Sequence, residues 1–277
     1  MIFSSIAPSP ALRELVRDYL IAHFLFDPHK PVPHKRYAPK PEQGITFFVR
    51  GRPSIVDSFT EESRVAPSVA IFGQQMKRCN VYLPPEFLMF RVHFQPGALF
   101  RMLGVPLYEF GEDYFDAELI LGRDAQDVGE RLRNARTYAE MVEAVEAYLL
   151  RLATKSNERV LPVDRAAARL TVDPVNVSLD WLASEASLSP RQFNRRFTER
   201  IGVGPKLYSR LIRYHRAHLF KAENPTIAWP RIAIEFGYTD YQHLVRDFRQ
   251  FTNATPTSWL REDAASPENV LVRSATE

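Results

Sequence analysis

Ile232-Ala233-Ile234-Glu235-Phe236-Gly237-Tyr238-Thr239-Asp240 is the stretch that decides the fold of the C-terminal half. The same pattern occurs 50 residues earlier, in Leu182–Ser189, and both copies continue into an apolar-periodic segment that closes at a proline. The matched pairs are Ala183 with Ala233, Glu185 with Glu235, Phe193 with Leu244, Arg195 with Arg246, Phe197 with Phe248, Pro205 with Pro256 and Tyr208 with Trp259. Self-similarity of this kind is the sequence signature of a repeated structural unit. The sequence therefore predicts two copies of one helical unit.

The residues between the two helices of each copy predict a tight turn and a capped second helix. Gly237 can adopt a positive φ without steric cost, which ends the first helix of the second copy. Ser189 and Asp240 are favourable N-caps, and Pro190 suits the first helical position. A short helix, a turn and a capped second helix are typical of a helix-turn-helix, whose second helix enters the major groove of DNA.

On the second helix of each copy, the side chains that face outward are of the types that recognise nucleic acids. We predict that base edges are read by Arg191, Asn194 and Arg195 in the first copy and by Gln242, Val245 and Arg246 in the second. Arg pairs with guanine, Asn and Gln pair with adenine, and Val packs on the thymine methyl group. The predicted phosphate contacts are Ser189, Arg196, Lys206, Arg210, Arg213, Tyr241 and Arg249. The alternative is that these are solvated helix faces of an ordinary bundle.

The charge distribution agrees with a polyanionic partner. Residues 1–160 contain 20 Lys and Arg against 20 Asp and Glu, whereas residues 189–261 contain 13 against 5. Between the copies, residues 206–223 predict an amphipathic helix of about 27 Å, which compares with about 34 Å between successive turns of one groove. His215 and His218 on this helix are three residues apart, and we interpret them as packing or phosphate-contacting residues rather than metal ligands.

Residues 163–262 resemble the AraC/XylS family of bacterial transcription regulators. The resemblance rests on residues 232–240, on Leu244–Phe251, on the Thr255-Pro256 and Trp259-Leu260-Arg261 ending, and on residues 188–193 and 202–205 of the first copy. It implies seven helices with two helix-turn-helix units, and double-stranded DNA and RNA polymerase as partners. Two positions depart from the family. Asn253 stands where glycine is common but tolerates the left-handed conformation, and Asp247 brings a negative charge near the DNA, where it is expected to pair with Arg246 or Arg249.

The first half is expected to be a mixed, strand-rich domain, so the whole chain is assigned to the α+β class. Short Phe-, Val- and Ile-rich runs separated by Pro and Gly are typical of strands; they are Ile45–Val49, Ser54–Phe59, Val69–Phe72, Val81–Leu83 and Phe87–Phe94. Leu12 to Leu20 have helical spacing, and an apolar stripe indicates helix from about Gln126. We predict a sensor or dimerisation domain over 1–155, a linker over 156–162, the DNA-binding domain over 163–262 and a tail over 263–277.

The resemblance also extends weakly to Phe90–Ala98 and Leu103–Pro106, which are similar to the β-rich sensor domains that precede such DNA-binding domains. In the family these domains bind a small effector, dimerise, or both. The sequence names no effector and leaves a homodimer open. The aromatic residues of this half either line an apolar pocket or fill the core of the sheet, with the core favoured for any single one; they are Phe47, Phe48, Phe72, Tyr82, Phe90 and Phe94.

Catalytic and metal chemistry are not expected. His23, His29, His34 and His93 are irregularly spaced for a metal site in a cupin-like barrel, and we interpret them as structural or surface residues. Cys79 lies beside Lys77 and Arg78, which would favour a redox thiolate, but it has no second cysteine to resolve it. No nucleophile–base pair or glycine-rich phosphate loop supports an enzyme in the first half. A DNA-repair or methyl-transfer protein would need a cysteine cluster. We predict no cofactor.

The chain shows no signal peptide and no apolar run long enough to span a bilayer. A single cysteine excludes an internal disulfide. These features predict a cytoplasmic protein with no membrane partner.

Overall fold

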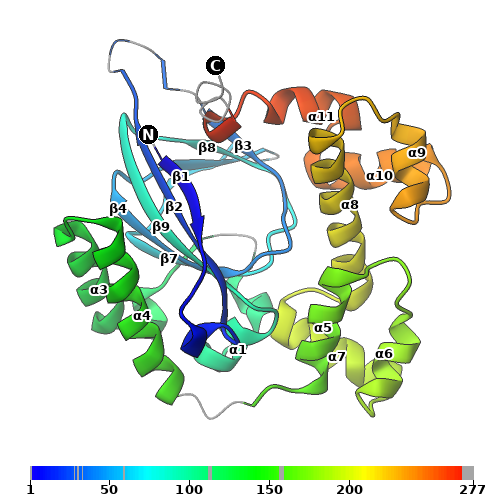
Figure 1. The fold of residues 1–277 in the computed structure, drawn as a ribbon, viewed down its shortest axis with the longest axis horizontal. Coiled ribbons are helices and arrows are strands. Elements are labelled where there is room, and N and C mark those ends of the chain that lie inside the picture. Colours follow the sequence, from blue (N-terminus) through cyan, green and yellow to red (C-terminus); the bar gives the residue numbers. More distant parts are fainter. Residues whose placement is uncertain are drawn as a thin grey trace.

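The computed structural model describes residues 2–269, apart from Pro28, Lys30, Pro33, Phe59, Glu112, Asp113 and residues 156–158. Figure 1 shows a β-rich N-terminal part, flanked on one side by two long helices and on the other by a helical C-terminal part. Most of the predicted linker, 159–162, is described. Residues 156–158, and 270–277 of the predicted tail, lie outside the described residues.

Two antiparallel sheets form the N-terminal part. The six-stranded sheet has the order β1-β2-β9-β4-β7-β10, and the four-stranded sheet has the order β3-β8-β5-β6. The strands are β1 (Ile2–Ile6), β2 (Val16–Leu25), β3 (His34–Tyr37), β4 (Gly44–Arg50), β5 (Ser54–Asp57), β6 (Ser63–Val65), β7 (Val69–Phe72), β8 (Cys79–Tyr82), β9 (Glu86–Phe94) and β10 (Tyr114–Asp116). The predicted strand-rich fold is therefore confirmed.

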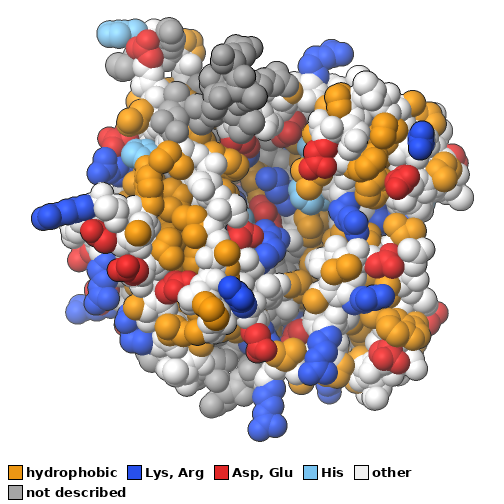
Figure 2. Space-filling model, viewed as in Figure 1, with side chains coloured by type: hydrophobic (Ala, Val, Ile, Leu, Met, Phe, Trp, Pro, Cys, Tyr) orange, Lys and Arg blue, Asp and Glu red, His pale blue; other side chains and the backbone are white. Residues whose placement is uncertain are grey.

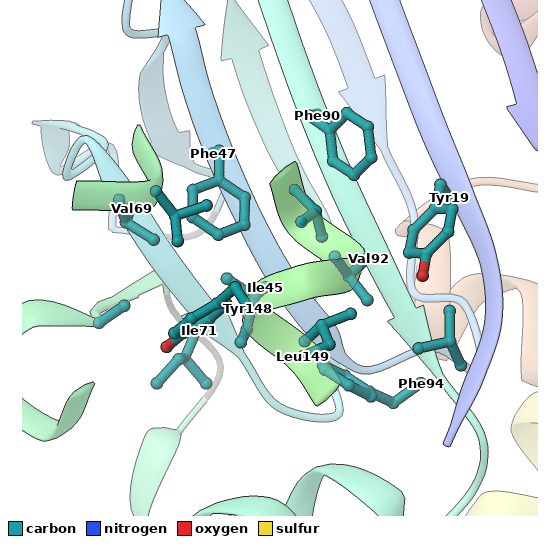
Figure 3. Packing of buried hydrophobic residues seen from close by; sticks show 14 of the residues in the cluster. Tyr19, Ile45, Phe47, Val69, Ile71, Phe90, Val92, Phe94, Tyr148 and Leu149 are labelled. Atoms are coloured by element: carbon teal, nitrogen blue, oxygen red, sulfur yellow. The ribbon is translucent and has the colours of Figure 1, made fainter. Parts of the chain in front are cut away.

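The larger sheet is buried on both faces, and alternation along its strands separates two layers. Ile45 and Phe47 of β4, with Val92 of β9, join one core cluster, which Figure 3 shows facing Tyr148 and Leu149 of a helix. The intervening residues belong to a second cluster between the two sheets; examples are Ala22, Phe24, Phe48, Phe87 and Met89. Burying one such large apolar side chain contributes about 1.5–3 kcal/mol.

Helices cover the outer face of the larger sheet. α1 (Ala98–Leu103) follows β9, α2 (Glu118–Leu121) follows β10, and α3 (Arg123–Asn134) and α4 (Tyr138–Lys155) pack on the sheet as Figure 1 shows. Two 3-10 turns, η1 (Pro10–Leu12) and η2 (Leu107–Phe110), complete this part. No helix among the described residues is both long and apolar enough to cross a membrane.

The predicted N-terminal helix over residues 12–20 is wrong. Only η1 is helical there, and β2 begins at Val16. The reason is pairing, since β2 lies between β1 and β9 and hydrogen-bonds to both. Tyr19 and Ile21 face the helices while Ala22 and Phe24 face the second sheet, so a strand buried on two faces has an apolar run that resembles helical spacing.

Seven helices form the C-terminal part, as predicted. They are α5 (Pro162–Val172), α6 (Leu179–Glu185), α7 (Pro190–Ile201), α8 (Pro205–Glu223), α9 (Trp229–Glu235), α10 (Tyr241–Thr252) and α11 (Pro256–Asp263). Figure 1 shows α8 running between a lower group of helices, α5 to α7, and an upper group, α9 to α11. The α+β assignment and the helical C-terminal domain are thus confirmed.

Candidate nucleic-acid interface and barrel pocket

The two repeats form turns with the same backbone hydrogen bonds. Leu188 N donates to Ala183 O at 3.0 Å, and 50 residues later Tyr238 N donates to Ala233 O at 2.9 Å. Each bond closes the end of a seven-residue helix, α6 or α9, and redirects the chain into the next helix. The repeat in the sequence is therefore a repeat in the backbone.

The conformations that the sequence predicted for the turns and helix ends are present. Gly237 has φ 71°, and Ser187 takes the equivalent position of the first copy with φ 53°. Ser189 and Asp240 accept hydrogen bonds from the backbone N–H three residues later, at 3.3 Å and 2.7 Å. Asn253 has φ 55° and ends α10 in the left-handed conformation, as expected from its replacement of a glycine.

Each helix-turn-helix unit has a core of its own. The first is built from α5 to α7 and one face of α8; its centre contains Leu170, Leu182, Phe193, Phe197, Ile201, Tyr208 and Ile212. The second is built from α9 to α11 and another face of α8; its centre contains Leu211, Tyr214, Trp229, Ile232, Leu244, Phe248 and Trp259. Because α8 contributes to both cores, it fixes the second helices α7 and α10 relative to one another.

Most of the predicted base-reading side chains are exposed. Arg191, Asn194 and Arg195 are exposed on α7, and Gln242 and Arg246 are exposed on α10. In the view of Figure 2, Lys and Arg side chains on the helical part are interspersed with acidic and apolar ones rather than gathered into one patch.

The prediction that Val245 faces outward is wrong. Its side chain is only 7% exposed and lies beside the buried Leu244. The apolar face of α10 is wider than the matching face of α7, because Val245 is buried where Asn194 is exposed. α7 and α10 therefore present different sets of side chains.

Asp247 also differs from expectation, because its side chain is fully buried inside the protein. Its Oδ1 pairs with Arg210 of α8 at 2.6 Å, not with Arg246 or Arg249, and Arg210 also donates to Gln250 at 2.5 Å. A buried carboxylate needs such a partner, and α8 supplies it. Arg210 therefore connects α8 to α10. Its guanidinium group is engaged within the protein, unlike the exposed cations among the predicted phosphate contacts.

The other predicted phosphate contacts fall into two groups. Arg213 donates to Gly237 O at 3.0 Å and lies over the Tyr238 ring, so it too holds the second unit together. The exposed or half-exposed members are Ser189, Arg196, Lys206, Tyr241 and Arg249. Lys206 stands in the first turn of α8, and Ser189 and Tyr241 stand at the first turns of α7 and α10, where backbone N–H groups favour anions.

A second candidate site is a cavity of about 220 Å³ inside the N-terminal part, which we call the barrel pocket. Its walls are formed by side chains that point into the space between the two sheets. The apolar ones include Leu20, Phe24, Phe48, Val81, Phe87 and Met89. Of the aromatic candidates from the sequence, Phe48 lines this pocket, Phe47 and Phe90 fill the core on the other face of the sheet, and Tyr82 is exposed. Phe72 and Phe94 are also buried, and Phe94 borders a separate cavity between the two parts of the chain.

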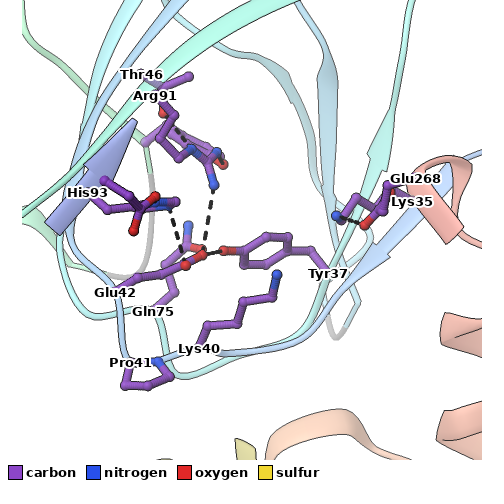
Figure 4. A network of polar contacts seen from close by, with 12 residues as sticks. Lys35, Tyr37, Lys40, Pro41, Glu42, Thr46, Gln75, Arg91, His93 and Glu268 are labelled. Atoms are coloured by element: carbon purple, nitrogen blue, oxygen red, sulfur yellow. Dashed lines mark hydrogen bonds and ion pairs between the residues drawn. The ribbon is translucent and has the colours of Figure 1, made fainter. Parts of the chain in front are cut away.

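Charged residues gather at one end of the barrel pocket. Figure 4 shows the Glu42 carboxylate at the centre of this network, which Tyr37 contacts through its hydroxyl. His93 Nε2 lies 3.3 Å from Glu42 and Arg91 Nη1 lies 3.9 Å from it. Burial opposes ionisation, but the nearby cationic groups, including His93, Lys40 and Arg91, outweigh it and hold the pKa of Glu42 well below its usual value. This carboxylate is therefore an anion at neutral pH.

The N-terminal part contacts the first helix-turn-helix unit through a buried ion pair. Arg200 of α7 pairs with Asp164 of α5 at 2.6 Å, and both side chains are 3% exposed. The Arg200 guanidinium lies 4.5 Å from the centre of the Phe100 ring on α1. Gln43 Nε2 donates to Ile201 O, the last carbonyl of α7, at 2.5 Å. The C-terminal end of α7 is thus part of the contact with the N-terminal part.

A separate contact joins the N-terminal part to the second unit. Arg36 and Arg78 both pair with Glu262 of α11 at 2.9 Å. Lys35 of β3 pairs with Glu268, which follows α11. Sequence reasoning missed these residues because each pair spans more than 150 positions, and nothing local in the sequence connects them.

Several histidine side chains contact other residues of the chain. His23 Nδ1 lies 2.7 Å from the Tyr138 hydroxyl, His34 stacks on Tyr82, and His93 bonds to Asp18. His218 pairs with Asp263 at 3.3 Å. The described residues contain no group of three His, Cys, Asp or Glu side chains placed to hold a metal ion.

Each of the two parts of the chain matches a known protein family. Residues 182–262 match the family described as "Helix-turn-helix domain", and residues 4–116 match one described as "Domain of unknown function (DUF6597)". No curated protein matches the sequence.

Among solved structures, the chain is similar to ToxT from Vibrio cholerae. An apo lysine-to-alanine variant of ToxT is 15% identical, with 88% of this chain and 97% of that chain covered and a TM-score of 0.50. ToxT with an unsaturated fatty acid bound is 14% identical, with 92% and 98% covered and a TM-score of 0.47. The AraC-like transcriptional activator CuxR is 12% identical, with 74% and 76% covered and a TM-score of 0.27. At these identities the likeness concerns the fold.

The matched domain coincides with the two repeats, their caps and the exposed arginines of α7 and α10. Residues 182–262 therefore belong to the matched helix-turn-helix family, and the chain as a whole has a fold similar to that of ToxT.

Proposed function

We propose that the protein regulates transcription by placing α7 and α10 in adjacent major-groove segments of one DNA duplex, and that a small effector in the barrel pocket modulates this binding. The observation that carries the proposal is the matched exposure of Arg191 and Arg195 on α7 and of Gln242 and Arg246 on α10. Each helix is capped, packs on its own core and exposes these side chains, as a groove-reading helix must.

The length of α8 supports binding to one side of the duplex. Its 19 residues correspond to about 28 Å, somewhat less than the roughly 34 Å between successive turns of the groove. Simultaneous insertion of both helices then requires some bending of the DNA, which the protein would favour at flexible base steps. Arg196, Lys206 and Arg249 supply phosphate contacts and make the affinity salt-dependent.

The test begins with selection of bound fragments from genomic DNA, which yields an operator. We expect Arg195→Ala and Arg246→Ala each to weaken operator binding by about 1–3 kcal/mol, at one base position each. Arg131→Ala removes the same charge from the exposed face of α3 and serves as the control. Unchanged operator affinity in both recognition-helix variants would contradict the proposal.

Phosphate contacts are tested by the salt dependence. Lys206→Ala is expected to weaken binding to every sequence alike and to reduce the slope of log affinity against log salt by about 1. A sequence-specific loss in this variant would mean that Lys206 reads bases instead. An RNA polymerase contact and a homodimer remain part of the proposal, to be tested by transcription in vitro and by the oligomeric state with and without operator.

A further inference from the structure

The barrel pocket combines an apolar body with one charged end. Leu20, Phe24, Phe48 and Met89 line the body, whereas the charged side chains lie together around Tyr37, as Figure 4 shows. A cavity of this kind matches a molecule that has an apolar chain or ring system and a single polar group.

The charges that line the pocket do not balance. Lys35, Lys40 and Arg91 contribute three cations, and Glu42 and Glu268 contribute two anions. The pocket therefore carries an excess of about one positive charge, which an anionic ligand would neutralise.

Lys40 is the pocket cation that is not held in a close ion pair, although its charge acts on Glu42. Its ammonium lies 5.3 Å from the centre of the Tyr37 ring, and it forms no ion pair with any residue that the structure describes. Glu42 already contacts Tyr37, Arg17, Arg91 and His93. A half-buried ammonium beside an apolar cavity lacks part of its hydration, so an anion bound there gains a charge-assisted contact.

Lys35 stands on the other side of this end of the pocket. Its ammonium lies 5.6 Å from the centre of the same Tyr37 ring and is paired with Glu268. Burial lowers the pKa of Lys35, and the charge of Glu268 offsets part of that effect. Glu268 comes from the segment after α11, so the chain itself brings a carboxylate to the place where the pocket attracts anions.

We propose that the barrel pocket binds an amphiphile with one anionic head group, which contacts Lys40 and displaces Glu268 from Lys35. This inference rests on the proposed function, because it specifies the effector of the same pocket. Glu268 acts as an internal competitor, so the apo protein holds its own acid where the ligand's acid binds.

Displacement of Glu268 would change the contacts of the second helix-turn-helix unit. The segment 264–269 follows α11 and is tied to its last residue, because Asn269 N donates to Ser266 O at 3.0 Å and Asn269 Nδ2 donates to Asp263 O at 2.8 Å. Asp263 in turn pairs with His218 of α8. Release of Glu268 therefore loosens a segment that is anchored on the helices of this unit.

The test uses the full chain and three ten-carbon probes in isothermal titration calorimetry: decanoate, decyl sulfate and 1-decanol. We expect both anions to bind about tenfold or more tightly than the alcohol, since a charge-assisted contact distinguishes them. A preference for decanoate over decyl sulfate would assign the site to carboxylates. Equal affinity for alcohol and anions, or no binding of any probe, would overturn the proposal.

Two variants separate the residues involved. Lys40→Met keeps the aliphatic stem and is expected to reduce decanoate affinity about tenfold while leaving decanol unchanged. Glu268→Gln removes the competitor and is expected to raise decanoate affinity several-fold. Lys77→Met, an exposed charge loss outside the pocket, is the control and should change neither. If Glu268→Gln leaves decanoate affinity unchanged or lowers it, the competition is refuted.

Hydrogen exchange provides an independent readout. With decanoate bound, backbone amides in peptides covering residues 262–269 should exchange faster, whereas decanol should leave them unchanged. Unchanged exchange at saturating decanoate would overturn the displacement of Glu268. Operator affinity of unliganded Lys40→Met should equal that of the wild type. A wild-type protein that binds its operator but does not prefer the anions to decanol refutes the ligand class and leaves the DNA-binding proposal standing.

Discussion

Arg195 and Arg200 lie five residues apart on α7, and we expect their replacement to have opposite consequences. Arg200 Nε and Nη2 donate to the two oxygens of Asp164 at 2.6 Å and 2.8 Å, with both side chains 3% exposed. Arg200→Met leaves the Asp164 charge buried, with the N–H of Leu161 as a hydrogen-bond donor and Arg101 as the nearby cation. Removing one member of such a pair costs about 3–5 kcal/mol of the free energy of unfolding. Arg195→Ala, at an exposed position, should cost less than about 0.5 kcal/mol.

Urea denaturation followed by circular dichroism measures this difference, with operator binding measured in parallel. Arg195→Ala should lose operator affinity at full stability, whereas Arg200→Met should lose stability first. Adding Asp164→Asn to Arg200→Met removes the unpaired charge and should restore part of the stability, since Asn still accepts from Leu161. If Arg200→Met unfolds within about 1 kcal/mol of the wild type, the ion pair does not hold α5 to α7 and the reasoning fails.

Two further predictions concern positions near the contacts between the two parts. Gly97 has φ 78°, and a Cβ at this position would lie 2.1 Å from Asp164 Oδ1. Gly97→Ala should therefore lower the melting temperature more than Gly104→Ala, because Gly104 has a similar φ of 67° but no atom within 4 Å of its Cβ position. An equal loss in the two variants would mean that backbone strain alone determines the effect. Burial, together with the charge of Lys40, lowers the pKa of His215 to about 3, so below about pH 6.5 the unfolded chain takes up a proton that the folded chain refuses. Stability should therefore fall from about pH 6.5 downward, and His215→Gln should flatten the slope between pH 6.5 and 5 by up to about 1.4 kcal/mol per pH unit; an unchanged slope in urea titrations would assign the acid sensitivity to other groups.

The C-terminal half could be predicted because its information is local and duplicated. Gly237 marks a left-handed turn by residue type alone. Ser187 does not, yet the repeat aligns it with Gly237, and both positions have positive φ. N-caps such as Ser189 and Asp240 are read from single residues in the same way.

The errors on α10 arise from packing between helices. Asp247 is a polar residue that helical periodicity alone leaves near the DNA, but Arg210 approaches from α8 and makes its burial favourable. Val245 is buried although its repeat partner Asn194 is exposed. A helical period identifies the centre of a buried face, whereas its width depends on the neighbouring helix.

In the N-terminal half the strands were predictable, but the pocket was not. Phe47 and Phe48 are adjacent and equally apolar, and one fills the core while the other lines the cavity. Which side becomes a cavity depends on how closely the second sheet approaches, and no local pattern encodes that distance. The same holds for Lys35 and Glu268, which meet across more than 200 positions of the chain.

The twelve residues of α7 serve both halves of the molecule at once. One end of the helix, at Arg200 and Ile201, contacts the β-rich part, and Arg191 at the other end is exposed to solvent. A rod of about 18 Å that tilts by about 10° at one end moves its far end by about 3 Å, which is the length of a hydrogen bond. In the proposed complex with DNA, a small rearrangement beneath Phe100 would therefore make or break contacts between the guanidinium groups of α7 and the bases.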